Sequence, residues 1–378
     1  MPRILFTSHS PAISGAEVVL LEILEQGAGT SAYIFEEGPL ARALEARGVS
    51  VTASRWGSGL STVKRDRSLL RALPLVWPIA AITLEIARLS RRHDVVYANS
   101  QKAFILSAIA TAISRRRLVW HLHDIPDTTH FGKAQLKLQV ALANRRATRV
   151  VVPSKAVADG FIAAGGRADL VRVVPNGVKP SLSILSKALQ REKLGLPTGP
   201  LVGVFSRLAS WKGQHVLLQA IAALPHVSCI IAGDALFGEE AYAAELKTLV
   251  QTLGISDRVH FLGQRNDVPA LMRAVDIAIH PSTSAEPFGL TIVESMFAGT
   301  PVIATAIGAV PDILDDGRAG TMVPPGDSVA LCRAIEAVLL DPEAKTVRAT
   351  ERAEALYTAQ RMRRTIFDLV DSIGQEAA

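Results

Sequence analysis

The sequence has little cysteine, few aromatic residues and no long apolar run. Only two of its 378 residues are cysteines, Cys229 and Cys332, in apolar surroundings and without metal-ligand spacing. They predict reduced core residues of a cytosolic protein and argue against a disulfide framework. No hydrophobic region followed by a cleavage site comes after Met1, so secretion is not expected. The most apolar stretch, residues 72–84, is too short to span a bilayer.

What the chain does contain is enough apolar sequence for two globular domains. Hydrophobic residues make up 49% of it and charged residues 20%, which is typical of folded proteins. Its length suits two domains of ordinary size. Charge is uneven, because residues 1–180 carry 24 Lys and Arg against 13 Asp and Glu, whereas the remainder carries 17 against 22. The basic first half favours an anionic substrate or surface.

Basic clusters in the first half lie near an apolar segment that carries tryptophans. Residues 64–67, 91–92 and 115–117 supply the cations, and Trp56 and Trp77 supply the aromatic rings. This combination suits peripheral contact with acidic lipid headgroups. The alternative is that these cations are solvated helix faces and loop ends.

Short apolar runs alternate with longer helical patterns, which predicts an α/β protein with parallel sheets covered by helices on both faces. The expected strands are residues 3–7, 32–35, 49–53, 94–98, 118–121, 149–152, 171–174, 201–206, 228–232, 259–262, 277–280, 301–304 and 321–323. The alternation pauses in a polar stretch between residues 175 and 200. We therefore expect two doubly wound, Rossmann-like domains, residues 1–180 and 195–356, facing each other across a cleft. A C-terminal helix over about residues 357–378 is expected to pack back on the first domain.

Two carboxylates eight residues apart, Glu286 and Glu294, flank a glycine at which a loop turns into a helix. If Gly289 opens that helix, the free N–H groups of the first turn and the helix dipole favour a phosphate there. Glu294 would then lie about one and a half turns into the helix, within reach of a ribose. Glu286 could accept hydrogen bonds from sugar hydroxyls. The segment suggests a sugar-nucleotide site, although an ordinary surface loop and amphipathic helix would show the same spacing.

Cations follow the first strand of the second domain. Arg207 and Lys212 should project from its C-terminal end, which is the edge where open α/β sheets bind ligands. Together they could neutralise a departing diphosphate, whereas each alone could be a surface cation. Arg265 lies at the equivalent edge after Gly263 and is placed to frame a base.

Candidate residues of the first half also follow strands. Gly15 lies where a helix begins and lets the backbone approach a ligand closely. The loop lacks the G-x-G-x-x-G pattern, and an ordinary turn that binds no ligand is the alternative. His121 and His123 fall on the same side if their strand continues that far. Two histidines are too few to hold a metal. A histidine that donates a hydrogen bond to a sugar hydroxyl is the favoured alternative to a structural one.

The ordered set of motifs resembles the family 4 glycosyltransferases of GT-B fold, over nearly the whole chain. The set consists of the glycine turn at Gly15, His123, Pro175-Asn176-Gly177, Arg207 with Lys212, Gly233-Asp234, and the segment from Glu286 to Glu294. The resemblance implies a retaining, metal-independent hexosyltransferase with a nucleotide-sugar donor and no further cofactor.

The resemblance also implies roles for residues of the second domain. Arg207 and Lys212 would hold the diphosphate, and Glu294 would hold the ribose. Glu286 would contact donor-sugar hydroxyls and Arg265 would lie near the base. Backbone N–H groups around Phe288, Gly289, Leu290 and Thr291 would assist Glu286.

In the first domain, the resemblance places His123 against the donor sugar near the reacting carbon. Gly15 would lie against phosphate or acceptor, while His121 matches a less regular position. One departure is Ser14-Gly15 where many members carry Gly-Gly. A side chain at that point can change how closely donor or acceptor approaches.

The expected function is transfer of a sugar to an acceptor hydroxyl in bacterial polysaccharide or glycolipid biosynthesis. It would take place in the cytoplasm, with peripheral contact to the anionic inner face of the plasma membrane and no nucleic acid. The first domain offers no carboxylate that compels double displacement, so same-face attack is expected, with domain closure around the donor. The alternative functions are a nucleotide-sugar epimerase of the same fold and a non-catalytic nucleotide-sugar-binding protein. The sequence leaves the base, sugar, acceptor, linkage and oligomeric state undetermined.

Overall fold

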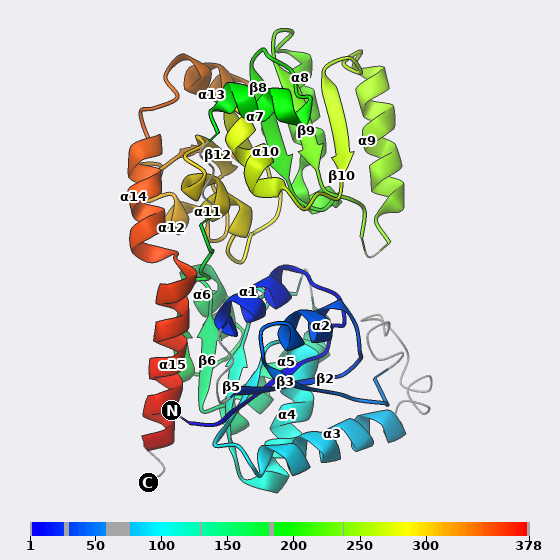
Figure 1. Cartoon of the computed structure of the whole chain (residues 1–378), viewed down its shortest axis with the longest axis vertical. Helices are drawn as coiled ribbons and strands as arrows, with labels where there is room; N and C mark the ends of the chain where they lie inside the picture. Colours follow the sequence, from blue (N-terminus) through cyan, green and yellow to red (C-terminus); the bar gives the residue numbers. More distant parts are fainter. Residues whose placement is uncertain are drawn as a thin grey trace. The chain divides into compact units, whose positions relative to one another are not determined.

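The computed structural model describes residues 2–25, 30–57, 76–128, 131–180, 185–236 and 238–375. The chain forms two compact units (Figure 1). Unit 1 comprises Met1–Gly177 and Ala359–Ala378, and unit 2 comprises Val178–Thr358. The basic cluster at residues 64–67 lies outside the described residues.

Unit 1 is built on a seven-stranded parallel sheet. Its strands are β1 (Ile4–Ser8), β2 (Thr30–Ile34), β3 (Ser50–Ala53), β4 (Val95–Ala98), β5 (Arg117–His121), β6 (Arg149–Val152) and β7 (Val171–Val173), in the order β3-β2-β1-β4-β5-β6-β7. Its helices are α1 (Gly15–Ile23), α2 (Pro39–Glu45), α3 (Val76–Ser90), α4 (Gln101–Ser114), α5 (Lys133–Arg146), α6 (Lys155–Ala163) and α15 (Ala359–Gln375), with a short 3₁₀ turn at Ala168–Leu170. The central strands are buried on both faces, as their Val-rich runs require.

Helix α15 is a C-terminal element of unit 1 that packs beside α1 (Figure 1). Met362, Ile366, Val370 and Ile373 are buried along it, and their spacing of three or four residues places them in one stripe. The Arg363 guanidinium donates to the backbone carbonyl of Glu22 at 3.0 Å and thereby fixes the helix.

Unit 2 is built on a six-stranded parallel sheet. Its strands are β8 (Leu201–Phe205), β9 (Ser228–Ala232), β10 (Val259–Gly263), β11 (Ile277–His280), β12 (Val302–Thr305) and β13 (Thr321–Val323), in the order β10-β9-β8-β11-β12-β13. Its helices are α7 (Lys187–Leu194), α8 (Gln214–Ala222), α9 (Glu240–Thr252), α10 (Val268–Ala274), α11 (Leu290–Phe297), α12 (Val310–Ile313), α13 (Ser328–Leu340) and α14 (Thr346–Leu356), with a 3₁₀ turn η3 at Ser210–Lys212.

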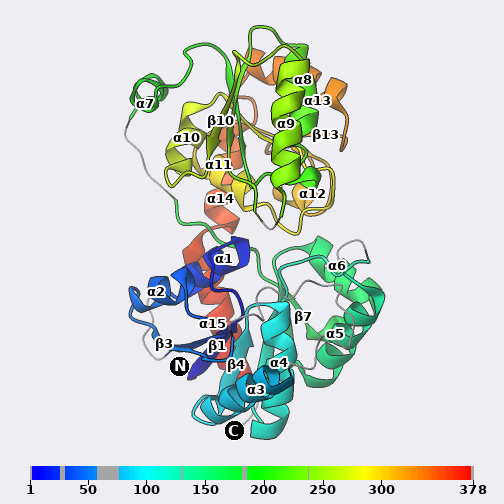
Figure 2. The same ribbon diagram turned by 90° about the vertical axis from the view of Figure 1, so that its right-hand side faces the viewer.

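Helix α7 lies in the stretch that the sequence analysis left between the two domains, and it packs on α10 of unit 2 (Figure 2). The Arg191 guanidinium donates to the carbonyl of Ala274 at 2.6 Å and to the Asp276 carboxylate at 2.7 Å. Lys187 reaches the same carboxylate at 3.1 Å. These contacts tie α7 to unit 2.

The expected α/β class and the doubly wound arrangement are confirmed, and every expected strand is present within two residues of its expected bounds. Both sheets reverse their order beside their first strand, between β1 and β4 in unit 1 and between β8 and β11 in unit 2. At such a switch point the connections on the two sides run to opposite faces of the sheet, and open α/β sheets bind ligands there. Of the helices within the described ranges, none offers the apolar length that crossing a bilayer requires.

Candidate active site

The site in unit 2 is built where the loop after β8 meets the loop after β11. Gly213 has φ 72°, and a Cβ there would lie 1.9 Å from the carbonyl oxygen of Pro281. The Thr283 N–H also donates to the carbonyl of Trp211 at 2.8 Å. The two loops therefore meet backbone to backbone, which only a glycine at position 213 permits.

The two cations that the sequence predicted to act together, Arg207 and Lys212, both lie near the ring of Trp211. The Arg207 Cζ lies 5.5 Å from the centroid of that ring, and the Lys212 Nζ lies 4.2 Å from it. Both distances allow cation–π attraction. The structure thus brings Arg207 and Lys212 to one place, as expected for cations that act together.

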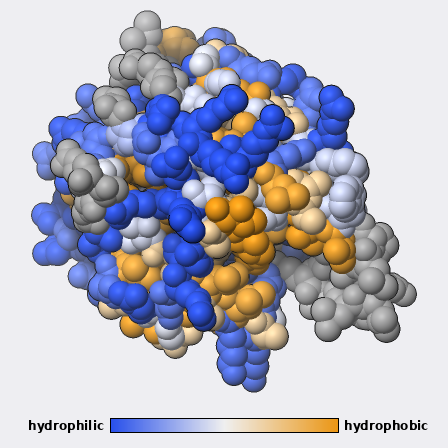
Figure 3. All heavy atoms as spheres, turned by 90° about the horizontal axis from the view of Figure 1, so that it is seen from below, coloured by the Kyte–Doolittle hydropathy of each residue, from blue (hydrophilic) through white to orange (hydrophobic). Residues whose placement is uncertain are grey.

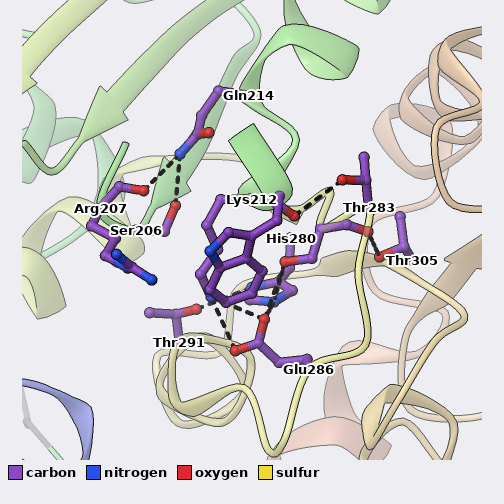
Figure 4. Close-up of polar contacts among 11 residues, drawn as sticks. Ser206, Arg207, Lys212, Gln214, His280, Thr283, Glu286, Thr291 and Thr305 are labelled. Atoms are coloured by element: carbon purple, nitrogen blue, oxygen red, sulfur yellow. Dashed lines mark hydrogen bonds and ion pairs between the residues drawn. The ribbon is translucent and has the colours of Figure 1, made fainter. Parts of the chain in front are cut away.

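Lys212 and Glu286 form a buried ion pair. The Nζ lies 3.0 Å from Oε1 and 2.9 Å from Oε2, with 12% and 10% of the two side chains exposed. His280 Nε2 lies 3.1 Å from Oε2, and the Ser282 hydroxyl donates to the same oxygen at 3.1 Å (Figure 4). Burial opposes ionisation of Glu286, but the charge of Lys212 and the contacts with His280 outweigh it and lower the pKa of this carboxyl below its usual range.

The backbone around Glu286 is held as firmly as its side chain. Its carbonyl accepts the N–H of Ala309 at 2.9 Å, and a Cβ on Gly308 would lie 2.4 Å from that carbonyl oxygen. The Thr305 hydroxyl donates to the carbonyl of Ser282 at 2.6 Å. The position of the carboxylate is therefore set by β12 and the following turn as well as by its own loop.

Helix α11 begins where the sequence analysis expected it, with Gly289 as its N-cap at φ 94°. The N-cap makes no side-chain hydrogen bond, and the Ile292 N–H donates to the carbonyl of Gly289 at 3.1 Å. The N–H groups at the start of the first turn, at Leu290 and Thr291, are therefore the ones placed to meet an anion. Thr291 Oγ1 lies 3.2 Å from Nδ1 of His280, which joins the first turn to the carboxylate network. The Phe288 ring is buried against Tyr357, so this residue offers its backbone to the site.

Glu294 lies half-buried on α11, and its side-chain carboxyl makes no hydrogen bond or ion pair with any described residue. Burial raises the pKa of its carboxyl to about 7. An unpaired carboxyl of this kind can accept hydrogen bonds from a ligand that replaces its lost hydration.

Gln214 supports the loop that carries Arg207, a role that the sequence analysis did not foresee. Its fully buried amide donates to the Ser206 hydroxyl at 3.0 Å and to the carbonyl of Arg207 at 2.9 Å (Figure 4). The Tyr242 hydroxyl donates to its amide oxygen at 3.2 Å. The amide therefore fixes the backbone from which the guanidinium projects.

Arg265 stands apart from this cluster. Its guanidinium holds the Asp267 carboxylate through two hydrogen bonds of 2.8 and 2.6 Å, and within the described ranges no contact links it to Lys212 or Glu286. Its side chain is 37% exposed, which leaves its outer face open to a ligand.

In unit 1, His121 and His123 lie together at the end of β5, with ring centroids 3.9 Å apart. His121 Nδ1 lies 3.0 Å from the Tyr97 hydroxyl, and His123 Nε2 lies 3.0 Å from Oδ1 of Asn99. Burial lowers the pKa of His123 to about 3, and burial followed by the neighbouring ring lowers that of His121 well below its usual value. Both rings are neutral at physiological pH.

Gly15 is the first residue of α1, preceded by Ser14 as N-cap. The Ser14 hydroxyl donates to the Glu17 carboxylate at 2.5 Å, and the Ser14 N–H donates to the same carboxylate at 3.3 Å. This capping box gives Ser14 a local structural function. The side chain that distinguishes this chain from Gly-Gly sequences is thus engaged by its own helix.

The residues that sequence reasoning missed share one signal. Asn99, His280, Ser282 and Gln214 are polar residues within a few positions of a strand end or at a helix start, and all four are buried. Buried polar groups at the carboxyl edge of a parallel sheet point to a hydrogen-bond network there.

Two doubly wound units, with cations, a carboxylate and a helix N-terminus at the switch point of one of them, are the features of a GT-B glycosyltransferase. Residues 186–356 match the model for glycosyl transferases group 1, and residues 38–182 match the model for Glycosyltransferase Family 4. The chain belongs to the family 4 glycosyltransferases.

Similar proteins come from sequence and from structure. The chain is 37% identical over 182 residues to the lipopolysaccharide core biosynthesis glycosyltransferase LpsE of Rhizobium meliloti (strain 1021), covering 48% of this chain and 52% of that protein. It is 32% identical over 246 residues to the lipopolysaccharide core biosynthesis mannosyltransferase LpcC of Rhizobium leguminosarum bv. viciae. This match covers 60% of this chain and 70% of that protein. The crystal structure of Anabaena Alr3699/HepE in complex with UDP and glucose superposes with a TM-score of 0.87 at 35% sequence identity. The superposition covers 98% of this chain and 100% of that chain.

Proposed function

We propose that this protein is a retaining hexosyltransferase that moves a sugar from a nucleotide-sugar donor to an acceptor hydroxyl without a metal ion. The observation that best supports this proposal is that two cations, a carboxylate and a helix N-terminus lie together at the switch point of unit 2. These are Arg207, Lys212, Glu286 and the start of α11. The UDP and glucose complex of the Anabaena protein supports a nucleotide-sugar donor. No cofactor enters this proposal.

The cations act on the leaving group. As the bond between the sugar C1 and the phosphate oxygen breaks, negative charge collects on the diphosphate, and Arg207, Lys212 and the α11 N-terminus stabilise it. The acceptor oxygen bonds to C1 from the same face, and its proton passes to the departing phosphate oxygen. We propose same-face attack because no carboxylate in the first half of the sequence compels a double displacement.

The remaining residues bind the donor. Glu286 accepts hydrogen bonds from sugar hydroxyls, assisted by backbone N–H groups around Phe288, Gly289, Leu290 and Thr291. Glu294 accepts hydrogen bonds from the ribose, which its unpaired carboxyl supports. Arg265 lies near the base.

Two residues of unit 1 are also proposed to contact ligands. His123 contacts the donor sugar, and Gly15 lies against phosphate or acceptor. The capped start of α1 supports the second role, because Gly15 presents no side chain there.

The proposed pathway is bacterial polysaccharide or glycolipid assembly, at the cytoplasmic face of an anionic membrane. The relatives named for lipopolysaccharide core biosynthesis support this assignment. In unit 1, α3 exposes Val76, Trp77 and Leu84, and the neighbouring α4 exposes Ile109 and Ile113. The view from the side of α3 and α4 shows hydrophobic side chains gathered among hydrophilic ones (Figure 3). Exposed arginines at positions 88, 91, 92 and 115 add the charge that acidic headgroups attract.

The test is a transfer assay with a panel of nucleotide sugars and short glycan or glycolipid acceptors, with and without EDTA. We expect one donor to be consumed, the product to keep the anomeric configuration of the donor, and EDTA to have no effect. Lys212→Ala should abolish transfer while Lys155→Ala, an exposed lysine of unit 1, leaves it unchanged. An inverted product, or a trapped glycosyl-enzyme adduct, would refute the mechanism.

A further inference from the structure

Asn99 follows β4 at the switch point of unit 1 and is fully buried. Its side-chain amide bridges two elements. Nδ2 lies 3.1 Å from the carbonyl oxygen of Ala16 in α1, and Oδ1 lies 3.0 Å from Nε2 of His123, just after β5. Because β4 lies between β1 and β5 in the sheet, this residue is placed to link the loops that follow both neighbours.

The carbonyl of Ala16 decides which way this amide faces. A backbone carbonyl can only accept a hydrogen bond, so the NH₂ group of Asn99 must face it. The amide oxygen then faces His123 and can only accept. The nitrogen of His123 at that contact must therefore be the one that carries the proton.

A neutral imidazole has one proton, so protonation at Nε2 leaves Nδ1 as an acceptor. The ring is neutral because burial lowers its pKa to about 3. The two described side chains that contact this ring are uncharged, since His121 is neutral and Asn99 is an amide. No described residue hydrogen-bonds to Nδ1 of His123.

We propose that Asn99 is a positioning residue that locks His123 as the Nε2–H tautomer, so that Nδ1 accepts a hydrogen bond from a hydroxyl of the bound sugar. The proposal rests on the proposed function for the identity of the ligand. It reverses the direction expected from the sequence, in which the histidine donates. The site then recognises a group that carries a hydrogen, which a hydroxyl does and a fluorine or ether oxygen does not.

The neighbouring residue gives the same turn a second anchor. The hydroxyl of Ser100 lies 2.7 Å from Nδ1 of His9, in the loop after β1, and it also caps α4 by accepting the N–H of Ala103. Ser100 is therefore a matched control for Asn99, because it also links this turn to another loop but does not touch His123.

The tautomer is tested by nitrogen NMR of the full-length protein labelled with ¹⁵N-histidine, with His123 assigned by comparison with His123→Phe. In the wild-type protein we expect a protonated Nε2 and an unprotonated Nδ1. Asn99→Ala should shift both resonances toward the average of two exchanging tautomers. Ser100→Ala should leave the pattern unchanged. A protonated Nδ1 in the wild type, or an unchanged pattern in Asn99→Ala, would overturn the proposal.

Ligand recognition is tested with UDP-glucose and its deoxyfluoro analogues, in which one hydroxyl at a time is replaced by fluorine. We expect the analogue at the hydroxyl that meets His123 to bind about tenfold more weakly than the parent, as the loss of one such hydrogen bond predicts, and His123→Phe to remove this difference. A loss at a hydroxyl that meets Glu286 should persist in His123→Phe. Equal binding of all analogues overturns the hydroxyl part of the proposal. The NMR experiment needs no substrate. It therefore tests the tautomer of His123 even if the proposed function is wrong.

Discussion

Lys212 Nζ lies 3.0 Å from Oε1 and 2.9 Å from Oε2 of Glu286, and the two side chains are almost completely buried. Both residues are separately proposed to bind the donor. In the structure each holds the other, and donor binding would therefore replace part of this ion pair with contacts to phosphate and sugar.

Breaking this pair from one side should be costly. Lys212→Met or Glu286→Gln leaves a buried group without its partner, and we expect each to lower the free energy of unfolding by about 3 kcal/mol. The double variant should lose less than the sum, because neither charge is left unpaired. Urea unfolding of the four proteins measures the coupling.

The exposed pair between Lys155 and Asp159 is the control, with 69% and 58% of its side chains accessible. Lys155→Met should change the free energy of unfolding by less than about 1 kcal/mol. Additive effects in the Lys212 and Glu286 variants would show that the two residues are not coupled.

Glu294 gives the protein a pH dependence of known sign. Burial raises the pKa of its carboxyl from 4.5 in the unfolded chain to about 7 in the folded one. The folded state then binds more protons than the unfolded state between these values, so stability falls as pH rises from about 4.5 to 7 and levels off above. Glu294→Gln should remove this component and unfold at a higher temperature than the wild type at pH 8, with little difference at pH 4.5.

Ribose binding at Glu294 should favour the ionised carboxylate, which accepts hydrogen bonds. UDP-glucose has no group that titrates near neutrality, and we expect its affinity to fall about tenfold between pH 8 and pH 6. Calorimetry should show a flatter profile for Glu294→Gln. A wild-type affinity that is constant over this range would count against the assignment.

Gly213 should tolerate no side chain, because a Cβ would meet the carbonyl of Pro281. Gly195 is the matched control, since it has a similar φ of 64° but nothing within 4 Å of its Cβ position. We expect Gly195→Ala to cost about 1 kcal/mol from its left-handed backbone and Gly213→Ala to cost about 3 kcal/mol. Equal melting temperatures for the two variants would contradict the close approach of the loops.

The exposed face of α3 should bind acidic bilayers. Trp77 is 66% exposed, and we expect Trp77→Ser to weaken sedimentation with vesicles of phosphatidylglycerol and phosphatidylcholine about tenfold. Leu340→Ser removes a residue that is 88% exposed in unit 2 and should have no effect. Binding of the wild type that ignores both salt and the acidic lipid would refute an electrostatic contact.

The sequence predicted the elements of the fold and the edge at which the site is built. Alternating apolar runs and Gly or Pro breakers are local patterns, and they located the strands and the helix start at Gly289. Arg207 and Lys212 could be placed together because they follow the same strand, as the structure then showed. The pairing of Lys212 with Glu286 was not predicted, since the two lie 74 residues apart.

The hydrogen-bonded supports were missed for the same reason. His280 closes a predicted strand, yet nothing near it in the sequence indicates that its two nitrogens contact Glu286 and Thr291. Gln214 resembles any polar residue at a helix start until the fold buries its amide under the loop of Arg207. These contacts depend on which strands are neighbours.

The sequence by itself determined where strands and helices form and which polar side chains stand at their ends, because hydrophobic period and backbone preference act over a few residues. Only the tertiary structure decided which of those side chains meet. The order of strands around each switch point brings β8 beside β11 and β4 beside β5. That order converts residues distant in the chain into an ion pair in unit 2 and a fixed histidine in unit 1.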